Sequence, residues 1–127
     1  MPVMRAGEVS KREVDDRAAQ GAFIQEFITA REGAPNFALR VFELLPGGYT
    51  PYHAHPWEHE NYILEGEGVL VNPDGSTTPL RPGDAVLVPP MQKHQYRNTG
   101  TGVFRFICCI PVQEACAPTT LPDQNQK

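Results

Sequence analysis

Long apolar runs and abundant cysteine are both missing from this sequence of 127 residues. No apolar run approaches the roughly 18 residues that a membrane-spanning helix requires, which argues against a membrane partner. The first residues lack the apolar core of a signal peptide, so we expect a cytoplasmic protein. The cysteines, Cys108, Cys109 and Cys116, are an odd number without a Cys-x-x-Cys pair. Free thiols in a reducing compartment fit them better than a disulfide framework.

Clustered basic charge is missing as well. The chain has 11 basic and 15 acidic residues, a formal net charge of −4, and no run of lysine or arginine that could neutralise phosphates. Nucleic acid is therefore not an expected partner. By contrast, 13 prolines and 11 glycines are spread along the chain. Because these residues interrupt helices, we expect short strands joined by tight turns.

Turn signals recur about every 8 to 12 residues, which is typical of an all-β sandwich or barrel. We expect a single domain with an N-terminal arm over 1–21, a barrel over 22–112 and a disordered tail over 113–127. The arm is either flexible and loosely held, or an edge strand that contacts a partner subunit in a dimer. Strands are expected at 37–45, 60–65, 68–71, 77–80, 85–88, 94–97 and 103–110, with a strand or one helical turn at 22–29.

The chain contains four histidines, His53, His55, His59 and His94. His53 and His55 are two residues apart, so on an extended strand both side chains leave the same face. A hairpin-like return after the bend at Pro56-Trp57 would bring His59 opposite this pair, and His94 comes from a distant strand. Imidazoles that converge inside a barrel suit a divalent first-row metal. A lone His-x-His is more often a pair of surface or core histidines than a metal site. The surrounding glycines and prolines are therefore needed to distinguish the two.

The spacing of these residues resembles that of the cupins, a family of small metal-binding jelly-roll barrels. The first cupin motif is glycine, five residues, His-x-His, three or four residues, glutamate, six residues and glycine. Gly47, His53, His55, His59 and Gly66 keep these intervals. The resemblance implies an all-β cupin jelly-roll β-barrel.

The second cupin motif is glycine, five residues, Pro-x-Gly, two residues, histidine, three residues and asparagine. Gly83, Pro89, His94 and Asn98 keep its intervals. Met91 stands where the family has its middle glycine, and we expect only a local adjustment of that turn.

A second departure is that His59 stands where most cupins carry glutamate. Glu60 follows one residue later, but only five residues then separate it from Gly66. Alternation along a strand lets only one of the two side chains point inward. Because His59 keeps both intervals, we predict four histidine ligands with Glu60 outward, as in a four-histidine cupin subgroup.

The resemblance implies one divalent transition metal at the four histidines, with Mn or Fe as the functional ion and Zn, Ni or Cu as ions acquired during expression. Four neutral ligands leave the +2 charge uncompensated, which favours an anionic or chelating small-molecule substrate. Open positions on the metal suit dioxygenase-type oxidoreductase chemistry. The alternative is a non-catalytic barrel that binds a metal or small molecule. Cupins of this size commonly pair through sheet edges, so the resemblance also implies a homodimer.

Strand parity predicts the wall of the substrate pocket. If His94 points inward, Tyr96 does so too. Burial of Arg105 would be costly, so the opposite face of its strand should line the barrel interior. That face carries Phe104, Phe106, Cys108 and Ile110. We expect Phe106, Cys108 and Ile110 to line the pocket and Phe104 to belong to the core.

Two polar residues are candidates for a catalytic role. Tyr96 could transfer a proton, although simple core packing is an equal alternative. Arg40 could hold a substrate carboxylate if it faces inward, or form a salt bridge at a strand end. Trp57 is expected to pack against the bend rather than to bind substrate.

Overall fold

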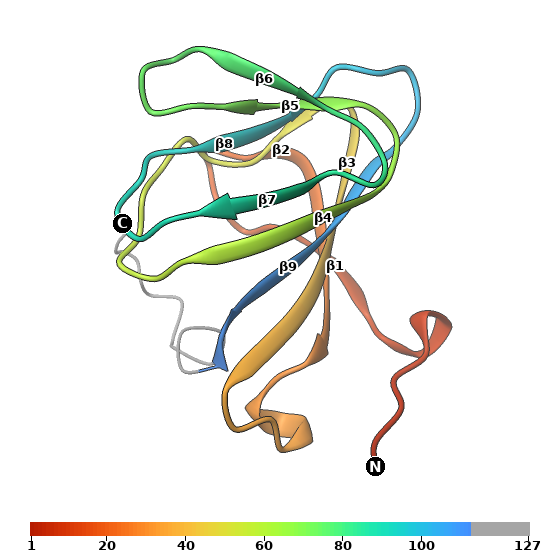
Figure 1. Cartoon of the computed structure of the whole chain (residues 1–127). Helices are drawn as coiled ribbons and strands as arrows, with labels where there is room; N and C mark the ends of the chain where they lie inside the picture. The colour runs from red at the N-terminus through yellow and green to blue at the C-terminus, as the bar shows by residue number, and fades with distance from the viewer. Residues whose placement is uncertain (113–127) are drawn as a thin grey trace.

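The computed structural model describes residues 1–112. Apart from two short 3₁₀ turns, η1 (Ala6–Glu8) and η2 (Ala30–Glu32), its secondary structure is all β, and one antiparallel sheet curls on itself into a half-barrel (Figure 1). The strands are β1 (Lys11–Glu13), β2 (Gln20–Ile28), β3 (Phe37–Tyr49), β4 (His59–Glu65), β5 (Gly68–Val71), β6 (Thr77–Leu80), β7 (Ala85–Val88), β8 (Gln95–Asn98) and β9 (Phe104–Pro111). The expected all-β jelly-roll fold is confirmed. The tail predicted at 113–127, with Cys116, lies outside the described residues.

Strands that are distant in sequence are neighbours in the sheet. The main path runs β6-β5-β8-β3-β9-β4-β7, and β2 pairs with β3 and β1 beside it. β9 therefore lies between β3 and β4, while β8 lies between β5 and β3. This crossing order brings the segments before β4 and β8, which carry His53, His55 and His94, to one region of the barrel (Figure 1).

Strand β9 shows the predicted alternation. Phe104, Phe106, Cys108 and Ile110 are buried, whereas the residues between them are only half-buried. Phe104 and Phe106 pack with Leu44 and Ile63 in the main hydrophobic core. Full burial of each such side chain stabilises the fold by roughly 1.5–3 kcal/mol.

The N-terminal arm is held by its own chain. β1 pairs antiparallel with the middle of β2, with Lys11 opposite Gln25. The Gln25 side chain donates hydrogen bonds of 3.0 Å to the carbonyls of Ala6 and Val9. The segment predicted as strand or helical turn at 22–29 is the strand β2. Contacts of the arm with a second subunit remain a prediction.

The strand expected to stop at Pro46-Gly47-Gly48 instead continues to Tyr49. The chain absorbs these residues as an irregularity, because Ala22 pairs with Leu44 while Gln20 already pairs with Tyr49. A Cβ atom on Gly48 would lie 2.8 Å from the Gly21 carbonyl oxygen. Only glycine allows the two backbones to approach this closely. Pro46-Gly47-Gly48 therefore forms a bulge within β3 instead of ending the strand.

The His-x-His segment is not the extended strand that the sequence predicted. His53 forms a single antiparallel bridge with His94, in which each backbone N–H donates to the other carbonyl at 3.1 and 2.9 Å. Pro51 and Pro56 flank the segment and have no N–H to extend a ladder in either direction. This pair of hydrogen bonds joins the His53 segment to the His94 segment, and β8 begins after His94.

Candidate metal centre and pocket

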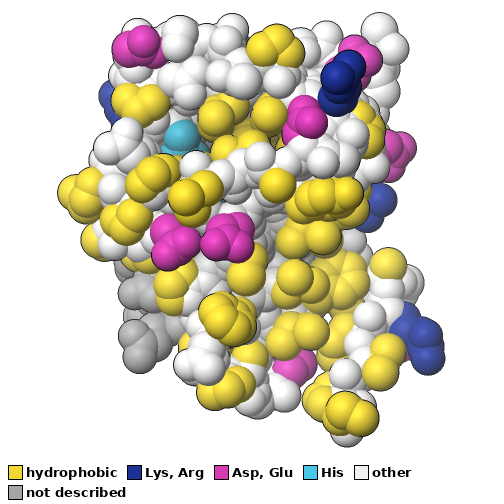
Figure 2. All heavy atoms as spheres, in the orientation of Figure 1, with side chains coloured by type: hydrophobic (Ala, Val, Ile, Leu, Met, Phe, Trp, Pro, Cys, Tyr) yellow, Lys and Arg dark blue, Asp and Glu magenta, His cyan; other side chains and the backbone are white. Residues whose placement is uncertain are grey.

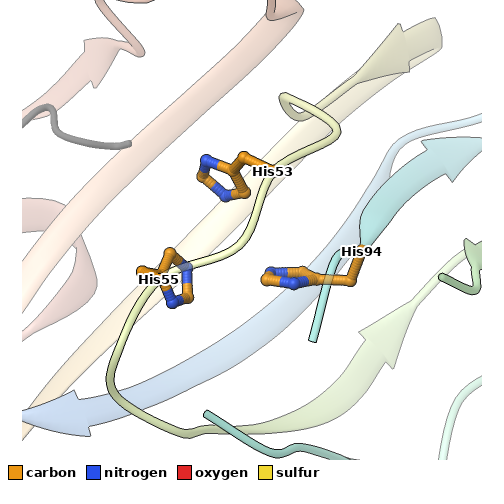
Figure 3. Close-up of side chains that lie close together, drawn as sticks. All are labelled: His53, His55 and His94. Carbon is orange, nitrogen blue, oxygen red and sulfur yellow. The ribbon is translucent and has the colours of Figure 1, made fainter. Parts of the chain in front are cut away.

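Three histidines form a group that could hold a metal ion. One ring nitrogen each of His53, His55 and His94 lies within 4.8 Å of the other two. Figure 3 shows the three side chains turned toward one another, two from the loop before β4 and one from the segment before β8. His55 and His94 are buried and His53 is half-buried.

Backbone carbonyls orient two of these rings. His55 Nδ1 lies 3.3 Å from the Trp57 carbonyl oxygen, and His94 Nδ1 lies 2.9 Å from that of Gln92. A carbonyl oxygen only accepts, so each Nδ1 carries the proton and each Nε2 keeps a lone pair for a metal. The Trp57 ring also stacks on His55 at 4.6 Å and borders the cavity beside the histidines, and its expected role in packing the bend stays a prediction.

His59 lies beside this group. It is buried at the start of β4, its ring stacks on His55 at 4.2 Å, and its Nε2 is 2.6 Å from His55 Nε2. Two nitrogens that both present lone pairs repel each other at this distance, so the arrangement requires a proton or a metal cation between or beside them. Glu60 is exposed on the other face of β4. Ligation by all four histidines remains a prediction.

Burial keeps the deep imidazoles in the neutral form that binds metals. Desolvation lowers the pKa of His59 well below its usual value, and the neighbouring His55 and His94 lower it further. Desolvation likewise lowers the pKa of His94. Neutral, buried imidazoles with converging lone pairs are a donor set that fits a divalent first-row metal.

A cavity of about 200 Å³ adjoins the histidines. All the residues predicted for the pocket line it: Arg40, Tyr96, Phe106, Cys108 and Ile110. Phe104 does not line it and is fully buried in the core, as expected. Figure 2 shows only a small spot of histidine surface on the face in view, bordered by hydrophobic side chains. The functional roles of the lining residues remain predictions.

Arg40, on β3, faces the cavity. Its Nη2 donates to Cys108 Sγ at 2.9 Å, and its guanidinium carbon lies 5.2 Å from the centre of the Phe42 ring. No ion pair within residues 1–112 includes Arg40, and the two roles expected for it, holding a substrate carboxylate or forming a salt bridge, stay predictions. Its Nε is buried and has no hydrogen-bond partner in that part of the chain. A buried donor left unsatisfied costs about 1–3 kcal/mol, which a ligand acceptor would offset.

The Tyr96 hydroxyl is already hydrogen-bonded within the protein. It donates to Asn61 Oδ1 at 2.7 Å, and the Asn61 amide donates to the Ile107 carbonyl at 3.2 Å. Burial raises the pKa of Tyr96, so its side chain is a neutral phenol at physiological pH. A proton transfer by Tyr96 would first have to break the bond to Asn61.

Sequence reasoning missed several residues that line the cavity. Asn61 could have been found, because it shares a strand face with His59. Val14 and Asp16 also line the cavity. They come from the N-terminal arm, and no periodic pattern there indicates that the chain returns to the barrel mouth. Thr50 accepts a hydrogen bond from the Tyr96 backbone N–H at 2.9 Å and so helps to place that residue.

The departure at Met91 has a structural cost. Met91 adopts a left-handed backbone conformation with φ of 68°, which glycine adopts without strain. Its N–H donates to the His55 carbonyl at 2.8 Å, so the second motif's turn supports the first motif's loop.

Asn98 has a structural role, because its side-chain amide donates to the carbonyls of Leu44 and Gly102 at 2.9 and 2.8 Å.

Comparison with known families decides the classification. Residues 40–110 match the Cupin domain family, over more than half of the chain. The chain belongs to the cupin family. The matched segment contains all four histidines and Arg40, so the resemblance seen in the two motifs is confirmed for this cupin. Within the described residues, no helix is long and apolar enough to cross a membrane.

Two proteins named for polyketide chemistry resemble the chain over most of its length. It is 34% identical to the polyketide cyclase RemF from Streptomyces resistomycificus, with a TM-score of 0.83 over 88% of this chain and 80% of RemF. It is 28% identical over 109 residues to the polyketide synthase CurC of Streptomyces cyaneus, which is 84% of this chain and 70% of that protein.

Similarity also extends to a dioxygenase. The chain is 30% identical over 98 residues to a gentisate 1,2-dioxygenase of a Streptomyces species, over 77% of this chain and 25% of the enzyme. This cupin thus spans about a quarter of the dioxygenase's length. Enzymes among its relatives indicate a small-molecule substrate.

Proposed function

We propose that this cupin is a metal-dependent enzyme that carries out a dioxygenase-type oxidation of a small, partly apolar molecule. The observation that carries the proposal is the convergence of four imidazoles at one cavity, which is otherwise lined mainly by apolar side chains and contains the unsatisfied donor of Arg40. A site that only stabilised the fold would need neither the cavity nor this donor.

The four histidines, His53, His55, His59 and His94, would hold one divalent ion through ring nitrogens. A bound Mn or Fe ion supplies redox chemistry and open coordination positions, whereas Zn, Ni or Cu could occupy the same imidazoles during expression. Because every ligand is neutral, the site retains a positive charge. That charge and Arg40 together favour an anionic substrate, whose carboxylate would complete the hydrogen bonding of Arg40 Nε.

The apolar side chains that line the cavity favour a substrate with an apolar part. Phe42, Phe106 and Ile110 offer aromatic and aliphatic surface, and they limit access of water to the cavity. The volume of about 200 Å³ is below the roughly 300–1,000 Å³ of sites for drug-sized ligands. A single-ring carboxylate fits this volume better than a long chain. Tyr96 would position the substrate or donate a proton after release from Asn61.

A second candidate is cyclisation of a polyketide, favoured by the similarity to RemF over four fifths of that cyclase. Cyclisation needs proton transfer and no O2. Tyr96 and the cavity residue Asp16 are the groups that could transfer protons.

One experiment separates the candidates. The protein is stripped of metal, reconstituted with Fe(II) or Mn(II) without air, and mixed with small aromatic carboxylates, enols and diketones while O2 is measured. The proposal predicts O2 uptake with at least one compound, and none with the His53→Ala variant. Conversion without O2 uptake would instead support the cyclase, and binding without any conversion would support a non-catalytic binder.

Pairing of two copies is also part of the proposal. β1 pairs with β2 from Phe23 to Gln25, and within residues 1–112 no further strand pairs with the outer edge of β1, which could therefore pair with a second copy. We expect a homodimer by light scattering after size exclusion. A monomer at micromolar concentration would contradict this expectation.

A further inference from the structure

Cys108 is a buried side chain for which the proposed reaction has no use. It is 1% exposed on β9, faces the cavity, and has His59 on one side and Arg40 on the other. Its sulfur lies 3.4 Å from His59 Nδ1 and 2.9 Å from Arg40 Nη2. A buried thiol with two nitrogen neighbours at these distances can orient them.

Nδ1 of each of three buried histidines has a defined partner. His55 and His94 donate Nδ1–H to backbone carbonyls, whereas the atom that faces His59 Nδ1 is the Cys108 sulfur. Metal-binding histidines generally donate their second ring N–H to an acceptor, which fixes the tautomer and the direction of the other nitrogen. Sulfur is a weak acceptor with more than one lone pair, so it can accept from both His59 and Arg40.

We propose that Cys108 is the positioning residue for His59: its sulfur accepts the Nδ1–H and so presents Nε2 to the metal, while Arg40 holds the sulfur in place. This inference rests on the part of the proposed function that makes His59 the fourth ligand. It connects the substrate-binding arginine to the metal centre through a single sulfur atom. Cys108 itself does not touch the metal.

The test compares two adjacent cysteines on opposite faces of β9. Cys108→Ala removes the acceptor, Cys108→Ser keeps a smaller one, and Cys109→Ala is the matched control, since Cys109 is half-buried on the outer face. Affinity is measured with Co(II) alone. We expect Cys108→Ala to weaken Co(II) binding about 10- to 100-fold, the usual effect of removing a residue that orients a ligand. Cys108→Ser should recover most of that loss, and Cys109→Ala should stay within about twofold of wild type.

A double-mutant cycle tests whether the effect passes through His59. In a His59→Ala background, Cys108→Ala should change Co(II) affinity by no more than about twofold. An equal loss in both backgrounds would overturn the inference, because Cys108 would then act on folding or on another ligand. If His59→Ala itself leaves Co(II) affinity unchanged, the fourth-ligand assumption fails and the inference fails with it.

Spectroscopy gives two readouts that do not depend on activity. In the Zn(II)-loaded protein, the Nδ1–H resonance of His59 should be shifted or lost in Cys108→Ala, while those of His55 and His94 persist. In the Co(II) protein, a near-ultraviolet sulfur-to-cobalt charge-transfer band that disappears in Cys108→Ser would overturn the inference by making the sulfur a ligand. Failure of the oxidation assay leaves these readouts unaffected, so the two proposals fail separately.

Discussion

Two parts of the histidine site are held in different ways. His55 and His94 belong to irregular segments joined by the backbone bridge between His53 and His94, and their Nδ1 atoms face backbone carbonyls. His59 belongs to a regular strand, and its Nδ1 faces the side chain of Cys108. Side-chain substitution therefore cannot remove the atoms that face Nδ1 of the first two rings, whereas substitution of Cys108 can remove the atom that faces Nδ1 of His59.

The two kinds of support predict different roles for the two sets of histidines. Metal affinity should depend mainly on the backbone-oriented histidines. An effect of substrate binding on the metal should pass along Arg40, Cys108 and His59, because the Arg40 guanidinium, which would hold the substrate, donates to Cys108, and Cys108 contacts His59. The following predictions test this division, beginning with the largest expected effect.

Loss of a backbone-oriented histidine should be the most damaging change. His94→Ala should weaken Co(II) binding by at least about 100-fold, more than loss of an orienting residue, because it removes a ligand directly. Titration of the metal-free protein with Co(II) measures the affinity. Glu60→Gln is the matched control, because Glu60 occupies the alternative motif position but is exposed on the other face. A large loss of affinity in Glu60→Gln would show that the ligand set is misassigned.

Removal of the cavity's arginine should weaken anion binding more than metal binding. Arg40→Met keeps a long apolar side chain but deletes the guanidinium. We expect about 10- to 100-fold weaker binding of benzoate to the metal-loaded protein, which corresponds to about 1.5–3 kcal/mol for a hydrogen bond to a charged group. Calorimetry measures the benzoate affinity of the metal-loaded wild-type and Arg40→Met proteins. If benzoate binds equally well to both proteins, Arg40 is not the anion site.

Removal of the metal should leave the barrel folded. The core cluster of Leu44, Ile63, Phe104 and Phe106 contains no histidine. A ligand present at 100 times its Kd stabilises the native state by about 2.7 kcal/mol, so chelation should lower Tm by several degrees without loss of β-sheet circular dichroism. Unfolding of the chelated protein at room temperature would indicate a structural metal site instead.

Relief of backbone strain at Met91 should have the smallest effect on stability. Met91 supports the loop of His55, one of the two histidines whose Nδ1 faces a backbone carbonyl. Met91→Gly removes a left-handed non-glycine conformation that costs about 1–2 kcal/mol, but it also raises the entropy of the unfolded chain. We expect a change in unfolding free energy of less than about 1 kcal/mol and unchanged Co(II) affinity. Chemical denaturation measures the first quantity. A destabilisation well above that value would show that the Met91 side chain contributes contacts beyond its backbone.

Much of the fold and the site could be predicted from local patterns. The two-residue period of β9 placed Phe106, Cys108 and Ile110 on the interior face, and the motif intervals distinguished His59 from Glu60. The first inference depends on strand alternation alone, and the second on the intervals of the cupin motif, which the chain's glycines and histidines reproduce. They therefore needed no knowledge of distant contacts.

The remaining features depend on contacts between distant segments. Pro46-Gly47-Gly48 is a bulge instead of a strand end because the backbone of β2 approaches Gly48. His53 forms an isolated bridge instead of a strand because its backbone pairs with His94, on a segment distant in sequence. Asp16 reaches the cavity because the arm pairs with β2. No local pattern contains such information.

The most direct test of the central claim is a crystal structure of the Zn(II)-loaded protein with anomalous data collected at the zinc edge. The account predicts one anomalous peak bound by ring nitrogens of His53, His55, His59 and His94 at about 2.0–2.1 Å, with the Cys108 sulfur outside bonding distance. A zinc ion bound by three histidines with His59 turned away, or bound by the Cys108 sulfur, would contradict it.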